Sequence, residues 1–272
     1  MDSTRLARSG RNCQSDGVEG PSLHLAAEQL HPFIGRRVRQ VTGNSRIGIE
    51  RLRGVVVRDL FAWGKHLVLQ FDRYALRVHF LLWGTFAATV RGASVTGDYR
   101  RTGAPRLVLG FATGEITIWS ASLKFIDDRY VRGAYDFTAD VMSPTWNPAA
   151  ALVKARAYRR QEVADVLLDQ AIFAGVGNII KNEVLFRTRT SPFAKVGRLG
   201  GRRLAAIVAE ARRFSFEFLA LRRQFALRRS LQVYGRSLCP ACGGKISRRV
   251  HGIRGRRSFF CARCQRVGRG MS

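Results

Sequence analysis

Acidic residues are scarce in this chain: 19 Asp and Glu stand against 47 Lys and Arg in 272 residues, which gives a formal net charge of +28. So basic a chain attracts polyanions such as DNA, RNA or an anionic membrane surface. No apolar run is long enough to span a bilayer, and residues 1–17 lack the apolar stretch of a secretory signal. We therefore expect a cytoplasmic protein with a nucleic-acid partner and no membrane association, although solubility alone is the simpler interpretation of the charge.

Cysteine is also scarce, with five in the chain. Cys13 stands alone in the polar leader 1–17, which we expect to be disordered, and no role can be derived for it. The others form two C-x-x-C pairs, the pattern of a structural zinc site: Cys239, Cys242, Cys261 and Cys264. A closed four-cysteine site leaves no position for water, so one zinc ion would fold a ribbon and not catalyse. Two disulfides are the alternative, which a reducing cytoplasm disfavours.

Short alternating apolar segments between residues 51 and 126 predict β structure. Strands are expected at 66–71 and 75–90, and a hairpin at 106–119 has Gly114 in its turn. Residues 21–34 precede them as a helix, with Pro21 in the first turn. Several short strands joined by tight turns favour a sandwich or a barrel.

After residue 150 the apolar period becomes helical. We expect helices at 161–173, 178–186 and 201–223. The chain is therefore predicted to be an α+β multidomain protein: a β-sandwich with a leading helix, a helical domain and a zinc ribbon. The predicted boundaries are a leader at 1–17, the sandwich at 18–137, a linker at 138–150, the helical domain at 151–235 and the four-cysteine domain at 236–268.

The sequence AGVGN at 174–178 breaks the helical pattern and predicts a helix–turn–helix hairpin. Gly175 and Gly177 have no Cβ, so their backbone N–H groups could approach a phosphate closely. Asn178 begins the next helix, where it could cap the helix or bind a phosphate oxygen. A plain helical hairpin with a capping asparagine explains the residues equally well.

Four motifs in order resemble the formamidopyrimidine-DNA glycosylase/endonuclease VIII family. They are EGPSLHLA at 19–26, WGKHLVLQF at 63–71, LLDQAIFAGVGNIIKNEVLF at 167–186, and VYGR at 233–236 leading into the cysteine ribbon. The resemblance covers about residues 18–268, nearly the whole chain. It implies a helix–two-turn–helix domain, one structural zinc ion, and a monomer that binds damaged double-stranded DNA in the nucleoid.

The resemblance implies roles for individual residues. Val18 matches the residue whose terminal amine attacks C1′ of the damaged nucleotide, and Glu19 matches the acid/base that protonates the opening sugar. Lys65 matches the lysine that contacts phosphate beside the lesion, and Arg256 the arginine tied to δ-elimination. Asn178 matches a phosphate-binding asparagine. The segment 79–84 matches the site of void-filling side chains, for which the candidates are Leu81, Leu82 and Trp83.

Each of these residues also has a plainer interpretation. Leu82 and Trp83 could belong to the core of the sandwich, and Lys65, which follows Gly64 in an expected turn, could be an exposed, solvated charge. Arg256 could simply add to the basic character of the chain. Apolar wedges would nevertheless offset the few kcal/mol that flipping a nucleotide out of a duplex costs.

The nucleophile departs from the family pattern because seventeen residues precede Val18. A terminal amine, with a pKa of ~7.7–8.0, is available as free base at neutral pH, whereas a peptide nitrogen is an unreactive amide. Proteolysis before Val18, or translation from codon 18 with methionine in its place, would supply the amine. We expect one of these routes to operate.

Two functions from different classes follow. The first, which the resemblance implies, is a bifunctional glycosylase and AP lyase. Residues 218–235 leave little room for the long loop with which the purine-preferring branch covers the lesion, so together with HFLLWG at 79–84 the resemblance is to the endonuclease VIII branch, which implies oxidised pyrimidines. The second is a damaged-DNA-binding protein that has lost its amine. An RNA-binding zinc-ribbon protein is a third, weaker possibility.

Overall fold

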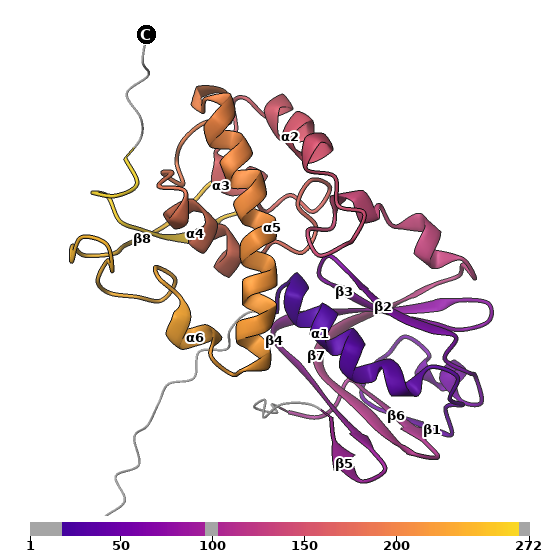
Figure 1. Ribbon diagram of the computed structural model, residues 1–272. Helices are drawn as coiled ribbons and strands as arrows, with labels where there is room; N and C mark the ends of the chain where they lie inside the picture. The colour runs from indigo at the N-terminus through magenta and orange to yellow at the C-terminus, as the bar shows by residue number, and fades with distance from the viewer. Residues whose placement is uncertain (1–17, 96–102, 267–272) are drawn as a thin grey trace, which may run out of the picture.

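The computed structural model describes residues 18–95 and 103–266, without the side chains of Leu82 and Trp83. The predicted leader, Cys13 and the last two residues of the predicted zinc domain lie outside these ranges. A β-rich half and a helical half lie side by side, and a two-stranded unit lies beyond the helical half (Figure 1). This order agrees with the predicted succession of leading helix, β block, helical block and ribbon.

Seven antiparallel strands form the sheet of the β-rich half, in the order β1-β6-β7-β4-β3-β2 with β5 on β4. All of them join one hydrogen-bonded sheet, and β4 has the predicted bounds. The predicted hairpin is present, because Phe111 pairs with Gly114 where β6 turns into β7. The strands are β1 Gln40–Thr42, β2 Asp59–Trp63, β3 His66–Gln70, β4 Ala75–Val90, β5 Ala93–Ser94, β6 Leu107–Phe111 and β7 Gly114–Ile126.

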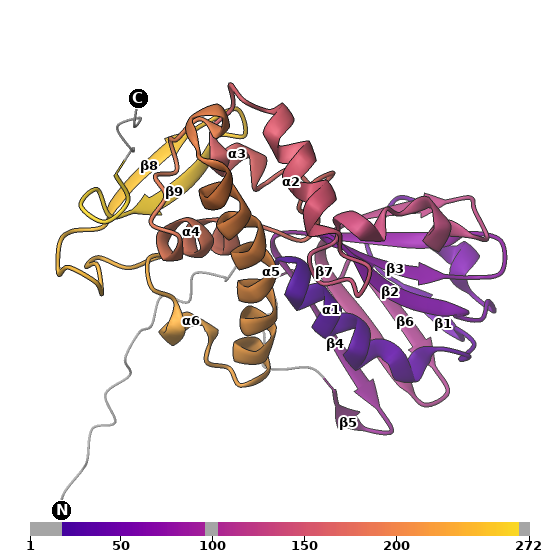
Figure 2. The ribbon, with the colours of Figure 1, turned by 45° about the horizontal axis from the view of Figure 1, so that its top comes forward.

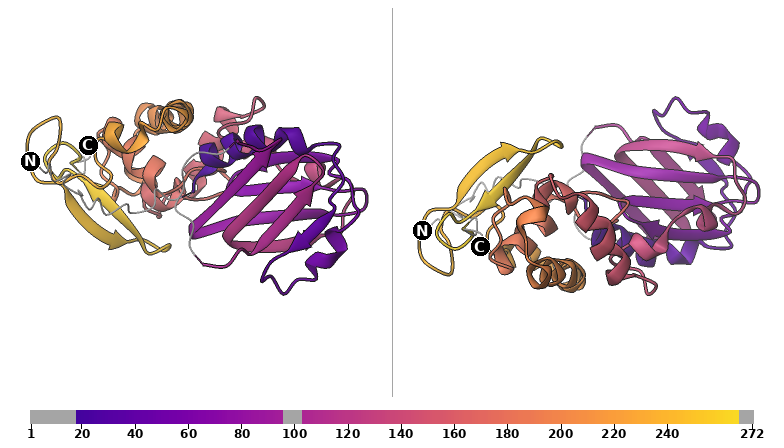
Figure 3. Two further views of the ribbon diagram at one scale, coloured as in Figure 1. Left: turned by 90° about the horizontal axis from the view of Figure 1, so that it is seen from below. Right: turned by 90° about the horizontal axis from the view of Figure 1, so that it is seen from above.

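The leading helix α1, Gly20–Leu30, covers one face of this sheet, where the strands it contacts most are β2 and β3 (Figure 3). Its apolar stripe, Leu23, Ala26 and Leu30, is buried against the strands, as the sequence pattern predicts. A smaller apolar cluster around Phe61 lies apart from this core and includes Val131. Five short 3-10 helices complete the described chain: His31–Phe33, Ile49–Leu52, Val131–Ala134, Phe137–Ala139 and Val196–Arg198.

The helical half is built around α5, Gly201–Arg223, which has the predicted bounds. It packs against α4, α1 and α2, so it contacts both halves of the molecule. Its apolar stripe includes Phe214 and Phe218, which have no exposed surface. The other helices are α2 Pro148–Ala157, α3 Val163–Val166, α4 Asn178–Arg187 and α6 Leu227–Ser230.

The helix predicted at 161–173 is wrong over most of its length, because α3 ends at Val166. Gln170 explains the early end. Its side-chain amide donates to the carbonyls of Leu168 and Val176, at 3.0 and 3.1 Å, and its carbonyl accepts from the N–H of Gly175. Side chains that bond the nearby backbone in this way compete with the helical ladder.

The segment predicted as a linker, 138–150, contains buried residues. Asp140, Val141 and Met142 are all less than a tenth exposed. Arg212 of α5 donates to the carbonyls of Val141 and Ser143, at 2.9 and 2.8 Å. This connection between the two halves is therefore packed and hydrogen-bonded to α5.

The hairpin of β8, Ser247–His251, and β9, Arg256–Phe260, docks on the helical half (Figure 2). Its tip is held by Asp165, whose carboxylate accepts from the N–H of Ile253 at 2.9 Å. Its second strand is held by Asn182, whose Oδ1 accepts from the N–H of Phe259 at 2.8 Å. Buried acceptors of α3 and α4 thus fix the hairpin's register on the helices.

None of the helices in the described ranges combines the length and the apolar character that a membrane span requires.

Candidate active site and metal centre

The carboxylate of Glu19 caps the N-terminus of α4. It accepts hydrogen bonds from the N–H groups of Gly177, Ile179 and Ile180, at 3.1, 2.6 and 3.1 Å. The first turn of a helix has free N–H groups and a positive dipole end, so an anion is favoured there. Glu19 is 3% exposed, and its oxygens are therefore held in one position beside the start of α4.

Two close backbone approaches make this contact possible. A Cβ on Gly177 would lie 2.3 Å from the carboxyl carbon of Glu19, so only glycine leaves room for the cap. The N–H of Gly20 donates to the carbonyl of Gly175 at 2.9 Å, and a Cβ on Gly20 would meet the Cα of Gly175 at 2.5 Å. Glycines therefore join the start of α1 to the turn before α4.

Val18 lies directly before Glu19 in the chain. Its side chain is half-buried and packs against the apolar core of the β-rich half. Because the next residue is held by three hydrogen bonds, the backbone nitrogen of residue 18 has a restricted position. A nucleophile at this nitrogen would stand one residue from a buried carboxylate.

Lys65 lies in the two-residue turn between β2 and β3, next to Gly64. The turn is held from two sides: the carboxylate of Asp140 accepts from the N–H of Gly64 at 2.8 Å, and Nδ1 of His79 lies 3.0 Å from the Lys65 carbonyl. Lys65 was expected to be an exposed turn residue, but it is half-buried. The turn faces the helical half, since Gly64 lies against Ala174 and Gly175.

Glu19 and Lys65 each affect the pKa of the other. Burial raises the pKa of the Glu19 carboxyl, while Lys65 and the three N–H donors oppose the rise. Burial also lowers the pKa of the Lys65 ammonium; Glu19 opposes this, and Arg256 and Arg254 add to it. Buried groups with perturbed pKa values that influence each other's charge are typical of acid/base sites.

Arg256 is exposed and begins β9. Its charge also acts on Lys181, a residue of α4 that is 1% exposed. Lys181 donates from Nζ to the carbonyl of Arg257 at 3.2 Å and to the hydroxyl of Ser258 at 2.9 Å. The strand that carries Arg256 is thus bonded to the helix that Glu19 caps.

Asn178 and the two glycines differ in part from the sequence-based expectation. Asn178 is the first residue of α4 and does not cap it, because Glu19 does. Its Oδ1 is buried without a hydrogen-bond partner among the described residues. The N–H groups of Gly175 and Gly177, which we expected to be available to a phosphate, donate instead to Gln170 and Glu19. A DNA contact at these three residues stays a prediction.

The proposed wedge segment lies at an irregularity of β4. The pairing of β4 with β7 changes register between Phe80 and Thr85, which leaves Leu81 and its neighbours out of the ladder. Leu81 is 51% exposed. The side chains of Leu82 and Trp83 are outside the described part of the structure, so the choice between wedge and core is open for them. Because Leu81 is exposed on a strand bulge, its side chain is accessible to a bound partner molecule.

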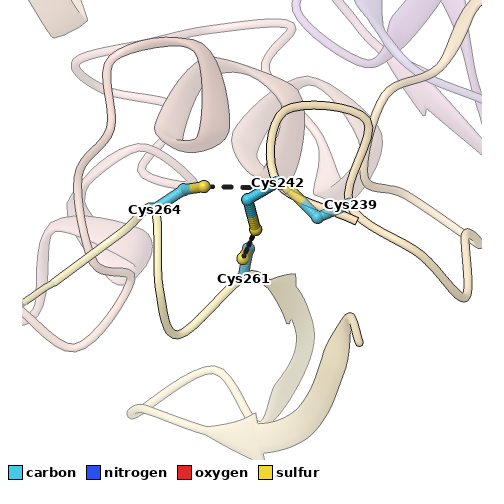
Figure 4. A group of neighbouring side chains, drawn as sticks. All are labelled: Cys239, Cys242, Cys261 and Cys264. Carbon is cyan, nitrogen blue, oxygen red and sulfur yellow. Dashed lines mark hydrogen bonds between the residues drawn. The ribbon is translucent and has the colours of Figure 1, made fainter. Parts of the chain in front are cut away.

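The four cysteines meet at one point at the base of the β8–β9 hairpin (Figure 4). Their sulfur atoms all lie within 4.8 Å of one another. Two pairs are 3.5 and 3.8 Å apart, and all four thiols are free, so the disulfide alternative is wrong. A tetrahedron with metal–sulfur bonds of ~2.3 Å requires sulfur separations of about 3.8 Å. The group can therefore hold a metal ion.

Sequence reasoning missed several residues that position the site: Asp140, His79, Lys181 and Asn182. A signal existed for the last two, because Lys181, Asn182 and Glu183 form a polar run inside an apolar helix. Such a run is usually a solvated face, yet all three are buried here. No local pattern distinguishes Asp140, whose partner lies 76 residues away.

Comparison with known proteins gives consistent results. The family described as the formamidopyrimidine-DNA glycosylase H2TH domain matches residues 140–217. "Probable endonuclease 8 2" from Streptomyces coelicolor is 30% identical over 271 residues, which cover 91% of this chain and 93% of that protein. "Endonuclease 8-like 3" from Mus musculus is 30% identical over 216 residues, 78% of this chain and 35% of that protein. The human protein of that name is 27% identical over 92% of this chain and 41% of its own length.

The chain therefore spans 35% and 41% of these two mammalian relatives, but nearly all of the bacterial one. Among solved structures, a viral DNA glycosylase has a TM-score of 0.77 at 20% identity and covers 91% of this chain and 100% of its own. The Lactococcus lactis formamidopyrimidine-DNA glycosylase bound to AP-site DNA has a TM-score of 0.76 at 19% identity, with 91% and 99% covered. These structures confirm the predicted fold.

Proposed function

Because this chain belongs to the formamidopyrimidine-DNA glycosylase and endonuclease 8 family, we propose that it is a DNA glycosylase with AP lyase activity in base excision repair. One observation carries the proposal. Glu19, a buried carboxylate of raised pKa, stands beside residue 18 and is fixed to the helical half by three hydrogen bonds. Acid/base chemistry next to a potential amine is what a Schiff-base mechanism requires.

We propose that the nucleophile is a free amine at residue 18, exposed by removal of the preceding residues or by initiation at that codon. Its lone pair bonds to C1′ as the glycosidic bond breaks and the base leaves with the bonding pair. Glu19, whose pKa is raised by burial so that it holds a proton more readily than an exposed carboxyl, gives a proton to the ring oxygen as the sugar opens. Loss of the amine proton leaves an imine, an electron sink that permits loss of a C2′ proton and departure of the 3′ phosphate.

Two cations would act on the phosphates in this scheme. Lys65, in its turn beside Glu19, would contact the backbone at the lesion, and its lowered pKa favours proton transfer during β-elimination. Arg256 would hold the phosphate that leaves in δ-elimination, since a guanidinium binds phosphate oxygens in a fork. Asn178 would bind a neighbouring phosphate at the start of α4.

The substrate we propose is damaged double-stranded DNA of the nucleoid, bound by a monomer. Oxidised pyrimidines are the proposed lesions. The chain from α5 to the cysteines is short and contains the small helix α6, so it leaves little room for the long loop that covers a purine lesion in the other branch of the family. Exposed Leu81, with Leu82 and Trp83, would fill the space that the flipped nucleotide leaves.

We infer that the cysteine group holds one zinc ion. Four thiolates in a closed tetrahedron are the usual ligands of structural zinc, and the sulfur spacing fits. The metal would fix the base of the hairpin that carries Arg256, and no step of the reaction uses it.

The test is incubation of the protein with 25-base-pair duplexes that contain thymine glycol or an abasic site, followed by separation of strand products. We expect release of the base followed by strand scission with thymine glycol, and strand scission alone at the abasic site. Tighter binding of the abasic duplex without scission would indicate a damage-binding protein that lacks the amine. Equal affinity for RNA and for intact and abasic DNA would indicate an RNA-binding zinc-ribbon protein.

A further inference from the structure

A second basic site lies in the helical half, at the opposite end of α4 from Glu19. It is a pocket of about 490 Å³ between the end of α4, the loop that follows and the start of α5. Four of its seven lining residues are arginines: Arg187, Arg189, Arg202 and Arg203. A ten-residue helix is about 15 Å long, so this pocket and the Glu19 site are separate.

Two arginines of the pocket are held by the protein. Arg187 forms a paired contact with Glu217, at 2.7 and 2.8 Å, and its guanidinium lies over the ring of Phe214. Arg203 donates to the carbonyl of Thr188. Their positions are set before a ligand arrives, which lowers the entropy cost of binding.

The other two arginines, Arg189 and Arg202, are exposed at the rim. In the described ranges, neither forms an ion pair. Glu210 is the single acidic residue in the lining. Its two carboxylate oxygens accept hydrogen bonds from Nε and Nη2 of Arg213, both at 2.6 Å. The pocket therefore keeps an excess of positive charge.

Arg189 also has an unfavourable backbone conformation. Its φ of 49° lies in the left-handed region, at the position after α4 where glycine is the usual residue. A long side chain there costs free energy that glycine would avoid. Strain of this kind is retained where the surroundings or a function require the residue, and the Arg189 side chain lines a pocket.

We propose that this pocket binds a phosphate group. The guanidinium groups of Arg189, Arg202 and Arg203 line one hollow of ligand size, and bidentate contact with phosphate is the strongest interaction open to them. Arg187, which is paired with Glu217, adds positive charge but no free pair of donors. The phosphate is either part of the DNA backbone outside the lesion or part of a free phosphorylated compound. The inference goes beyond the proposed catalytic function and does not depend on strand scission.

The first experiment measures binding of inorganic pyrophosphate by titration calorimetry, at constant ionic strength. The variant Arg189→Gln/Arg202→Gln is compared with the matched control Arg46→Gln/Arg53→Gln, which removes two exposed arginines from the β-rich half. We expect the pocket variant to bind about tenfold or more weakly than wild type, and the control to bind as wild type does. Equal binding by both variants would overturn the proposal.

A third variant separates function from folding. Arg189→Gly relieves the left-handed strain, so its melting temperature should equal or exceed that of wild type while pyrophosphate binding falls. A lower melting temperature together with unchanged pyrophosphate binding would mean that Arg189 is structural, and would contradict the proposal.

The source of the phosphate is identified with two abasic duplexes, of 12 and 30 base pairs. If DNA occupies the pocket, the Arg189→Gln/Arg202→Gln variant loses about two phosphate contacts with the longer duplex. The slope of log affinity against log salt concentration then becomes shallower by ~1.8 for that duplex, while the slope for the shorter duplex stays as in wild type. If a free compound is the ligand, pyrophosphate binding falls while both duplexes bind as with wild type. Either result supports the pocket, whether or not the protein cleaves.

Discussion

Glu19 accepts a 2.6 Å hydrogen bond from the backbone N–H of Ile179, a residue 160 positions away in the chain. This bond joins the first residues of the β-rich half to the first turn of α4. The carboxylate therefore has two duties, since it caps a helix and stands beside residue 18.

Removal of the Glu19 carboxylate should lower both stability and activity. Glu19→Ala leaves three buried N–H groups without an acceptor, so we expect a loss of about 2–4 kcal/mol in the free energy of unfolding. Glu19→Gln keeps one acceptor oxygen and should lose about half as much. Both should lose ~100-fold or more in strand scission, because neither side chain can donate a carboxylic proton. Urea unfolding and single-turnover scission measure the two effects; a fully active Gln variant would rule out the acid role.

Gly177 is required by the space that Glu19 occupies. Gly177→Ala places a methyl group within 2.3 Å of the Glu19 carboxyl carbon, which must move or distort the turn. We expect a destabilisation of about 1–3 kcal/mol and a loss of activity. The control is Gly133→Ala, where no atom lies within 4 Å of the added Cβ, and it should change stability by less than ~0.5 kcal/mol. Equal behaviour of the two variants would contradict the close packing described.

Lys181 should give the protein a measurable dependence of stability on pH. Burial lowers the pKa of Lys181 to about 8 from 10.5, so between these values the unfolded state binds more protons than the folded state. The contribution of Lys181 to the free energy of unfolding must therefore rise with pH in this window. Below pH 8 this contribution is at its lowest. Relative to Lys181→Met, wild type should gain up to ~1.4 kcal/mol per pH unit between pH 8 and 10. Denaturant midpoints across this range test the slope, and a constant difference would contradict it.

Removal of the metal should detach the hairpin from the helices. Cys261 is buried in the small cluster that also contains Phe186 of α4 and Phe259 of β9. We expect Cys261→Ser to lower the metal content below one ion per chain and to weaken binding of abasic DNA, because Arg256 is then no longer held. Cys13→Ser is the control and should keep the metal. Full metal content in the Cys261 variant would show that the four cysteines do not form one site.

The sequence predicts those parts of the fold that repeat regularly. The strand at 75–90 and the helix at 201–223 have their predicted bounds, because long apolar segments of strand and helical character mark them; the alternation in the strand is broken only where its pairing changes register, between Phe80 and Thr85. The helix at 161–173 fails because Gln170 forms three hydrogen bonds with the backbone that no periodicity reveals. Local patterns thus describe elements better than the turns between them.

The site is less predictable, since long-range contacts build it. The motifs drew attention to Glu19, but not to its place as the cap of α4, which depends on a fold that brings residues 19 and 179 together. The sequence predicts the turn that contains Gly175 and Gly177, yet the N–H groups of these glycines donate to Gln170 and Glu19 and are not free. Lys181 resembles a surface residue in the sequence, and only the docking of β9 buries it.

The most direct test of the account is reductive trapping at residue 18. Two forms of the protein, one that begins at Val18 and one that keeps residues 1–17, are incubated with abasic duplex DNA and borohydride, and their intact masses are measured. We predict a covalent protein–DNA adduct, mapped to residue 18, only for the form with the free amine. An adduct of equal yield from the form that keeps residues 1–17, or none from either form, would contradict the proposed nucleophile.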